Sequence, residues 1–229
     1  MFVLYPHQTH YIVSAGAAHL VPDDVPPERA VLAANLETAI NGVWDADIHP
    51  GDRVTVVGAG TIGCLVARLA GQIPGCDVEL VDVNPQRADL ARALGVAFAA
   101  PDTARANADV VMHTSGSASG LDLALRLAGF ETAVIEMSWY GTQLVPLPLG
   151  AAFHARRLTL KSSQVGAVSP AQRPRWDARR RMQLALSLLN DAALDALITA
   201  ESGFDALPQV MAALAESPGG TVCHRIRYE

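Results

Sequence analysis

Residues 53–63 read Arg-Val-Thr-Val-Val-Gly-Ala-Gly-Thr-Ile-Gly, an apolar run followed by three glycines at the G-x-G-x-x-G spacing. Between a strand and a helix, this spacing gives each glycine a separate role. Gly58 makes a tight turn, Gly60 lets a diphosphate approach backbone N–H groups, and Gly63 lets the helix pack closely on the strand. The stretch therefore predicts the first strand, turn and helix of a dinucleotide-binding fold.

The helix expected after this turn opens with Thr61 and Ile62. The first amides of a helix have no intrahelical partner, and the helix dipole adds partial positive charge at the same end. We therefore expect Thr61 and Ile62, together with the three glycines, to hold the diphosphate of a dinucleotide.

A carboxylate follows at the spacing that such a fold requires. The apolar run at residues 78–81 predicts a second strand, and it ends in Asp82, which lies 19 residues after Gly63. An acid about 20 residues beyond the glycines hydrogen-bonds the adenosine ribose. The alternative is a glycine turn that merely packs, with Asp82 as a helix cap. Strand, helix, strand and acid in this order favour the dinucleotide, and the Asp82 charge would repel a 2′-phosphate, so NAD is expected and NADP is less favoured.

The rest of the chain alternates strands with helices, which implies parallel pairing and right-handed crossovers. We predict an α/β fold, a Rossmann doubly wound parallel six-stranded sheet. Ligands of such sheets bind beyond the carboxyl ends of the strands, where the glycine turn, Asp82 and residues 113–116 and 137–141 would share one crevice. The six strands are expected at residues 53–57, 78–81, 96–98, 109–113, 132–136 and 158–160.

Other elements are expected outside this sheet. Tyr11, Ile12 and Val13 favour a strand near the N-terminus, and helical spacing of apolar residues predicts a helix over residues 28–44. Later helices are expected from the basic run at residues 173–181 to Leu189 and over residues 204–215. Residues 221–227 favour a closing strand.

Composition limits the classes of function. The chain has 229 residues, half of them hydrophobic, but no apolar run reaches the roughly 18 residues that cross a bilayer, and the N-terminus lacks signal-peptide features. We expect a cytoplasmic protein. The net charge of −6 disfavours nucleic acid and membranes as partners. The basic run at 173–181 could hold a phosphate or a partner, but a solvated helix face is favoured.

With these motifs in place, the sequence resembles the medium-chain dehydrogenase/reductase superfamily, the zinc-type alcohol dehydrogenase group. The likeness is collinear over most of the chain. It includes residues 2–13, 36–40 and 50–54, the glycine motif with Asp82, residues 109–116, and the stretch from 204–208 to 220–222.

The resemblance implies a GroES-like barrel around the nucleotide domain, and most of that barrel has no counterpart here. The family's first cysteine ligand, its Gly-His-Glu segment and its four-cysteine zinc lobe are missing, and a further zinc-ligand position falls on Ala34. No zinc or other metal is expected, as in a zinc-lacking bacterial branch of the family. Full-length members carry a longer N-terminal portion, so a shortened gene product, a mis-chosen start codon and a trimmed protein all remain open.

The resemblance also implies a domain organisation. Residues 1–21 would be a remnant of the GroES-like catalytic domain, 22–50 a linker and helix, and 51–200 the Rossmann domain. Residues 201–229 would be a helix and strand that return to the remnant. Exposed barrel edges favour pairing, so a homo-oligomer is expected.

The expected function is NAD(H)-dependent, zinc-independent oxidoreduction of a small alcohol or carbonyl substrate. By resemblance, Thr114, Ser115 and Gly116 line the cofactor path, and Ser138 and Trp139 lie near the nicotinamide. Another group must then stabilise the developing alkoxide. The candidate catalytic residues are Tyr140, His7 and His113, although for any one residue in the His and Tyr cluster at positions 5–11 a half-exposed strand is favoured. The alternative function is a non-catalytic dinucleotide-binding or scaffold module, a truncated dehydrogenase.

Overall fold

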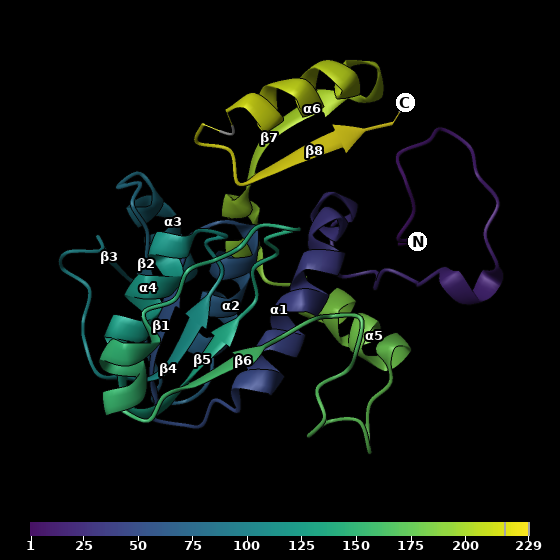
Figure 1. Ribbon diagram of the computed structural model, residues 1–229. Coiled ribbons are helices and arrows are strands. Elements are labelled where there is room, and N and C mark those ends of the chain that lie inside the picture. Colours follow the sequence, from purple (N-terminus) through teal and green to yellow (C-terminus); the bar gives the residue numbers. More distant parts are fainter. Residues whose placement is uncertain (218, 229) are drawn as a thin grey trace.

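The computed structural model describes residues 1–217 and 219–228; Pro218 and Glu229, which belong to the predicted returning segment 201–229, lie outside the described residues. Its main sheet has six strands in the order β3-β2-β1-β4-β5-β6, all parallel (Figure 1). This confirms the predicted doubly wound sheet. The strands are β1 (Arg53–Val57), β2 (Asp77–Val81), β3 (Ala97–Ala99), β4 (Ala108–His113), β5 (Ala128–Glu136) and β6 (Thr159–Ser162).

Helices cover both faces of the sheet, which explains why its central strands are largely apolar. Val56 of β1 belongs to the core beneath α1, α2, α3 and α5, whereas the next residue, Val57, belongs to the core beneath α4. The helices are α1 (Ala33–Ala46), α2 (Thr61–Gly71), α3 (Arg87–Leu94), α4 (Ala118–Leu127) and α5 (Ala178–Leu188).

The strand order places a switch point at β1. The chain leaves β1 for β2 on one side and later returns to β4 on the other side. The connections after β1 and β4 therefore run to opposite faces and leave a crevice between them, at the carboxyl ends of the strands.

A smaller layer lies beyond this end of the sheet. Two parallel strands, β7 (Ile198–Gly203) and β8 (Cys223–Arg227), pair with each other and pack with α6 (Leu207–Glu216) (Figure 1). The sequence predicted α6 and β8 but missed β7. The missed strand carries polar Thr199, Glu201 and Ser202, and half-exposed β7 lacks the continuous apolar run that marked the buried strands.

One expectation near the N-terminus was wrong. Residues 11–13 form no strand, and the side chain of Ile12 is 96% exposed. Residues 1–21 run instead as a loop with one 3-10 turn, Ala15–Ala17 (Figure 1). Within this loop, Phe2 and His19 make an antiparallel bridge. A β-prone sequence without a neighbouring strand has no ladder to join. The predicted helix over 28–44 begins as a 3-10 turn, Pro27–Leu32, and α1 then continues to Ala46.

None of the helices in the described part of the chain is long and apolar enough to cross a membrane.

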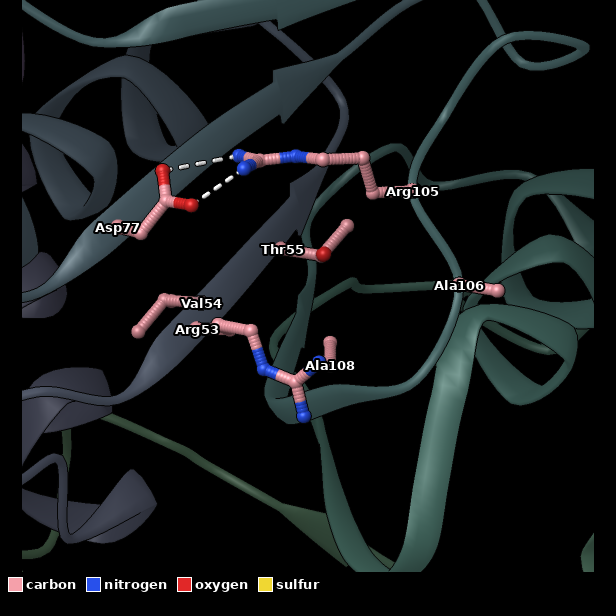
Figure 2. Close-up of a pocket in the computed structure, with 7 residues that line it drawn as sticks. All are labelled: Arg53, Val54, Thr55, Asp77, Arg105, Ala106 and Ala108. Atoms are coloured by element: carbon pink, nitrogen blue, oxygen red, sulfur yellow. Dashed lines mark hydrogen bonds and ion pairs between the residues drawn. The ribbon is translucent and has the colours of Figure 1, made fainter.

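A small hollow lies at the opposite, amino-terminal end of the strands (Figure 2). Its volume is about 260 Å³, and ion pairs border it. Arg105 binds both Asp77 and Glu79, and Arg53 binds Asp109 at 2.9 Å. The hydrogen bond from Arg105 lowers the pKa of Asp77 against the effect of burial. Each of these arginines is paired with a carboxylate. We therefore interpret the residues around the hollow as an ion-pair network that links the beginnings of neighbouring strands.

The basic run also contributes a buried residue. Arg173, Arg175, Arg179 and Arg180 are exposed, as a solvated face predicts, but Arg181 is only 2% exposed. Its guanidinium donates to Glu37 and Asn41 of α1 and to the carbonyl of Val165. This fan of hydrogen bonds joins α5, α1 and the loop after β6.

Replacing this buried guanidinium should destabilise the fold. Arg181→Ala leaves Glu37 and Asn41 without their donor, so we expect the free energy of unfolding to fall by about 3–5 kcal/mol. The exposed neighbour offers a matched control, and Arg175→Ala should change it by less than about 0.5 kcal/mol. Urea unfolding followed by circular dichroism measures both. Equal effects in the two variants would contradict the role given to Arg181.

Candidate functional site

The glycine turn joins β1 to α2 at the centre of the sheet, and its first and third glycines are required by packing. Gly58 has a positive φ of 109°, and a Cβ there would lie 2.7 Å from the backbone of Ser115. A Cβ at Gly63 would lie 1.8 Å from the carbonyl oxygen of Gly58 and 2.6 Å from Oγ1 of Thr114. Both positions therefore need glycine for the turn to form at all.

The second glycine is different. No described atom lies within 4 Å of the position that a Cβ of Gly60 would occupy, so the space in front of it is open. Gly60 is also the N-cap residue of α2, and it has no side chain to accept from the first amides of the helix. The result is an open, uncapped helix N-terminus, which is the geometry that accepts a phosphate. A diphosphate group fits these residues.

Asp82 lies at the tip of β2 and faces this turn. Its Oδ2 accepts from the amide of Ala59 at 2.7 Å, and its Oδ1 accepts from the amide of Asn84 at 2.8 Å. It does not cap α3, whose N-cap residue is Gln86. The carboxylate therefore stands beside the glycine turn, as the dinucleotide prediction required.

A cleft of about 630 Å³ opens over these groups. The C-terminal segment borders one side of this cleft, and two side chains next to the six-stranded sheet, Thr61 and Arg87, hold it in place. The hydroxyl of Thr61 donates to the carbonyl of Val222 at 2.7 Å, and Arg87 donates to the carbonyls of Gly220 and Thr221. The cleft lining includes Gly58, Gly60, Asp82, Arg87, Thr114 and Ser115.

The ends of β4 and β5 carry a polar cluster, which we call the His113 cluster: His113, Glu136, Ser115, Ser138 and Tyr140. His113 is fully buried. Its Nδ1 lies 2.8 Å from Oε2 of Glu136, and its Nε2 lies 2.7 Å from Oγ of Ser115. Ser138 Oγ and the Tyr140 hydroxyl lie 3.3 and 3.5 Å from Nδ1. Each of these five side chains thus has a polar partner within the cluster.

Burial and hydrogen bonds set the charge of this cluster. Burial disfavours the Glu136 carboxylate, but His113 and the amide and hydroxyl of Ser138 outweigh that effect and lower its pKa. Burial and the Glu136 charge raise the pKa of Tyr140 to about 12. At neutral pH Glu136 is therefore ionised, and Tyr140 keeps its proton.

The predicted crevice is confirmed in part. The glycine turn, Asp82, Thr114 and Ser115 border one cleft, but residues 137–141 are not among its lining residues. They contact its rim, because the amide of Gly116 donates to Ser138 Oγ at 3.1 Å. Trp139 is 87% exposed.

One candidate catalytic residue lies elsewhere. His7 is exposed and contacts the hydroxyl of Tyr228, far from the His113 cluster in the described contacts. Its sequence neighbourhood suggested a proton relay, but the fold brings no cleft residue to it. His7 is not among the residues that line the cleft.

Sequence reasoning missed Glu136 and Arg87. A signal for Glu136 was present: His113 and Glu136 each end a predicted strand, and in adjacent parallel strands such ends lie side by side. The structure pairs them in register. Arg87 had no such signal, because its partners belong to the remote C-terminal segment.

Within residues 1–217 and 219–228, no group of three or more His, Cys, Asp or Glu side chains could hold a metal ion. Burial raises the pKa of the Cys64 thiol to about 12, so this thiol is not a ready ligand. Ala34, the position that resemblance equates with a zinc ligand, contributes only its carbonyl, which accepts from the Thr38 hydroxyl.

Comparison with known proteins places this geometry among dehydrogenases. The L-threonine 3-dehydrogenase of Sinorhizobium medicae is 34% identical over 117 residues, which are 51% of this chain and 33% of that enzyme. The L-idonate 5-dehydrogenase of Escherichia coli superposes with a TM-score of 0.79 at 18% identity, covering 94% of this chain and 61% of that one. The chain is a relative of the medium-chain dehydrogenase/reductases. An alcohol dehydrogenase of E. coli CFT073, solved in complex with the cofactor NADH, superposes with a TM-score of 0.75 at 18% identity, covering 94% of this chain and 63% of that one.

No family profile matches the chain. The chain spans about a third of the length of the curated relatives that it matches. Structural likeness at 18% identity shows the fold alone, which this chain shares with 61% of the L-idonate 5-dehydrogenase chain.

Two glycine variants test which glycine of the turn is required by packing. Gly63→Ala forces a Cβ against the Gly58 carbonyl, so we expect it to lower the free energy of unfolding by about 3 kcal/mol or more. Gly60→Ala meets open space and should change it by less than about 1 kcal/mol. Thermal unfolding followed by circular dichroism measures both, and a Gly63→Ala protein as stable as Gly60→Ala would refute the packing role.

Proposed function

We propose that this chain is an NAD(H)-dependent, zinc-independent oxidoreductase that acts on an alcohol or carbonyl group of a small molecule. The open cradle at Gly60 carries this proposal. A glycine that packing does not require, at an uncapped helix N-terminus in a cleft, supports close approach of a diphosphate.

The preference for NAD rests on Asp82. Its carboxylate borders the cleft beside the glycine turn and carries a negative charge where the adenosine ribose would lie. A ribose hydroxyl can donate to this carboxylate, whereas a 2′-phosphate would meet like charge. Thr61 and Ile62 in the first turn of α2, with Thr114 and Gly116 after β4, would form the rest of the cofactor site.

A bound nicotinamide dinucleotide supplies the hydride, and the protein must move a proton. Tyr140 is our candidate donor, because at neutral pH it keeps its proton and its hydroxyl lies 3.3 Å from the Glu136 carboxylate. His113, which holds Glu136, is the candidate group behind it. Ser138 and Trp139, on the same loop as Tyr140, are proposed to face the nicotinamide.

The chain matches only 33% of the length of its relative L-threonine 3-dehydrogenase. This supports a second candidate function, a dinucleotide-binding or scaffold module without turnover. The two candidates share the cofactor and differ in chemistry. Oxidation of alcohols or reduction of aldehydes in a substrate panel would support the first, and binding of NADH without any turnover would support the second. A homo-oligomer also stays a prediction, which the mass of the protein in solution tests.

NADH titration tests the cradle directly. We expect NADH to bind the purified chain with a change in nicotinamide fluorescence, and Gly60→Val to weaken binding at least tenfold, because the new side chain fills the cradle. Gly16→Val, at an open position outside the cleft, is the matched control and should bind like the unmodified chain. No binding at about 1 mM NADH, a concentration that detects even weak complexes, would end the proposal.

Asp82 variants test the choice of cofactor. Asp82→Asn removes the charge but keeps an oxygen that can accept from Ala59, and Asp82→Ser removes most of the side chain. Both should raise the affinity for NADPH relative to NADH by about tenfold or more, since 1.4 kcal/mol of lost repulsion suffices. Parallel titrations with the two cofactors measure the ratio, and an unchanged ratio in Asp82→Asn would remove the charge from this role.

A further inference from the structure

Three side chains of the His113 cluster lie in the order of a serine nucleophile, a general base and an orienting carboxylate. Ser115 Oγ lies 2.7 Å from Nε2 of His113, and Nδ1 of the same ring lies 2.8 Å from Oε2 of Glu136. Both distances fall in the range that an activated serine requires. The three residues come from the ends of two adjacent parallel strands, which fixes their relative positions.

The hydrogen bonds also select the tautomer of the ring. Glu136 is ionised and can only accept, so Nδ1 of His113 carries the proton and donates to it. Nε2 is then unprotonated and accepts a hydrogen bond from the hydroxyl of Ser115. The other carboxylate oxygen accepts from the amide of Ser138 at 2.7 Å, which holds Glu136 in place. This is the tautomer that a general base needs.

The start of α4 makes room for this contact. A Cβ at Gly120 would lie 2.1 Å from Ser115 Oγ and 3.0 Å from His113 Nε2, so only glycine permits the pair at this helix position. The amide of Ser117 donates to Ser115 Oγ at 3.3 Å. Together with the nearby N-terminus of α4, this amide favours negative charge on the Ser115 oxygen.

Ser115 is also accessible. It is exposed and borders the 630 Å³ cleft, whose lining also includes the apolar residues Leu123 and Pro101. His113 and Gly120 are buried behind it. Ser115 therefore lies between the buried His113 ring and the cleft.

We propose that Ser115 is an activated nucleophile that attacks an acyl or phosphoryl ester bound in this cleft. For an acyl ester, Ser115 Oγ forms a bond to the carbonyl carbon while its proton passes to Nε2 of His113. The bond to the leaving oxygen then breaks, and that oxygen takes the proton from Nε2. Water, deprotonated in turn by His113, hydrolyses the acyl-serine and restores the enzyme.

This activity is separate from the oxidoreductase proposal. Ser115 borders the same cleft as the dinucleotide cradle, so the two ligands would compete for space. The serine chemistry needs no cofactor, however, and it can be measured on the chain alone.

The test uses a biotinylated alkyl fluorophosphonate, in which Ser115 Oγ would bond to phosphorus and fluoride would leave. We expect the unmodified full chain to be labelled once, at Ser115, by intact mass and peptide mapping. Ser115→Ala should not be labelled, and Glu136→Gln should be labelled about a hundredfold more slowly or less. Ser187→Ala, which changes an exposed serine of α5, is the matched control and should be labelled like the unmodified chain.

A cysteine variant keeps the test sharp if Ser115→Ala folds poorly. In Ser115→Cys, the new thiol should react with iodoacetamide at least about tenfold faster than the native, partly exposed Cys76, because His113 withdraws its proton. No labelling of the native chain, labelling at another serine, or an unreactive cysteine would each overturn the proposal. Labelling without NADH binding would uphold it while the oxidoreductase proposal fails, and NADH binding without labelling would do the reverse.

Discussion

The contact between α2 and the turn after β1 is the constraint on which the site depends. Gly63 packs so closely on the Gly58 carbonyl that a single methyl group would occupy the same space. This contact brings the first amides of α2 to the end of β1, and Gly58 in turn lies against the backbone of Ser115 after β4. Two crossovers that run to opposite faces of the sheet are thereby held together at one point, and the cleft opens between them. The N-terminus of α2, the Asp82 carboxylate and the His113 cluster are all positioned around this contact.

Parallel pairing then determines which side chains meet. Because β1, β2, β4 and β5 end at the same edge, the residues that end or follow them become neighbours although they are far apart in sequence. Asp82 reaches the amide of Ala59 across one strand pair, and Glu136 reaches His113 across another. The opposite edge holds charges too, and there Arg105 pairs with Asp77 (Figure 2). Arg105 also pairs with Glu79, and Arg53 pairs with Asp109, so these ion pairs hold strands together. At the carboxyl ends, by contrast, the Asp82 carboxylate borders an open cleft.

Features with a local cause could be predicted from the sequence, and features with a remote cause could not. The glycine turn, the six strands of the main sheet and Asp82 followed from spacing and apolar runs, since neighbours in sequence determine them. The strand expected at residues 11–13 failed because β-prone residues form a strand only beside another strand, and β7 was missed because it is half exposed and pairs with β8 far along the chain. His7 was a candidate because of the His and Tyr residues around it in sequence, and that local pattern does not say which residues the fold brings near it. Glu136 was recognisable only through the pairing of two predicted strand ends, and Arg87 acts through partners more than 100 residues away, which no local pattern reveals.

The His113 cluster shows how burial can create reactivity. A histidine that loses all contact with water must find partners for both ring nitrogens, because an unpaired polar atom in the interior is costly. On one side the in-register residue of β5, Glu136, accepts from the ring, and this fixes the proton on Nδ1. On the other side only an acceptor remains, and Ser115 donates to it. The need to pair both nitrogens of the buried His113 ring thus polarises the Ser115 hydroxyl, which lies at the cleft. A neutral amide in place of Glu136 could satisfy the same nitrogen, but it would not stabilise a protonated ring, so the carboxylate is the part of this arrangement that hydrogen-bond satisfaction alone does not explain.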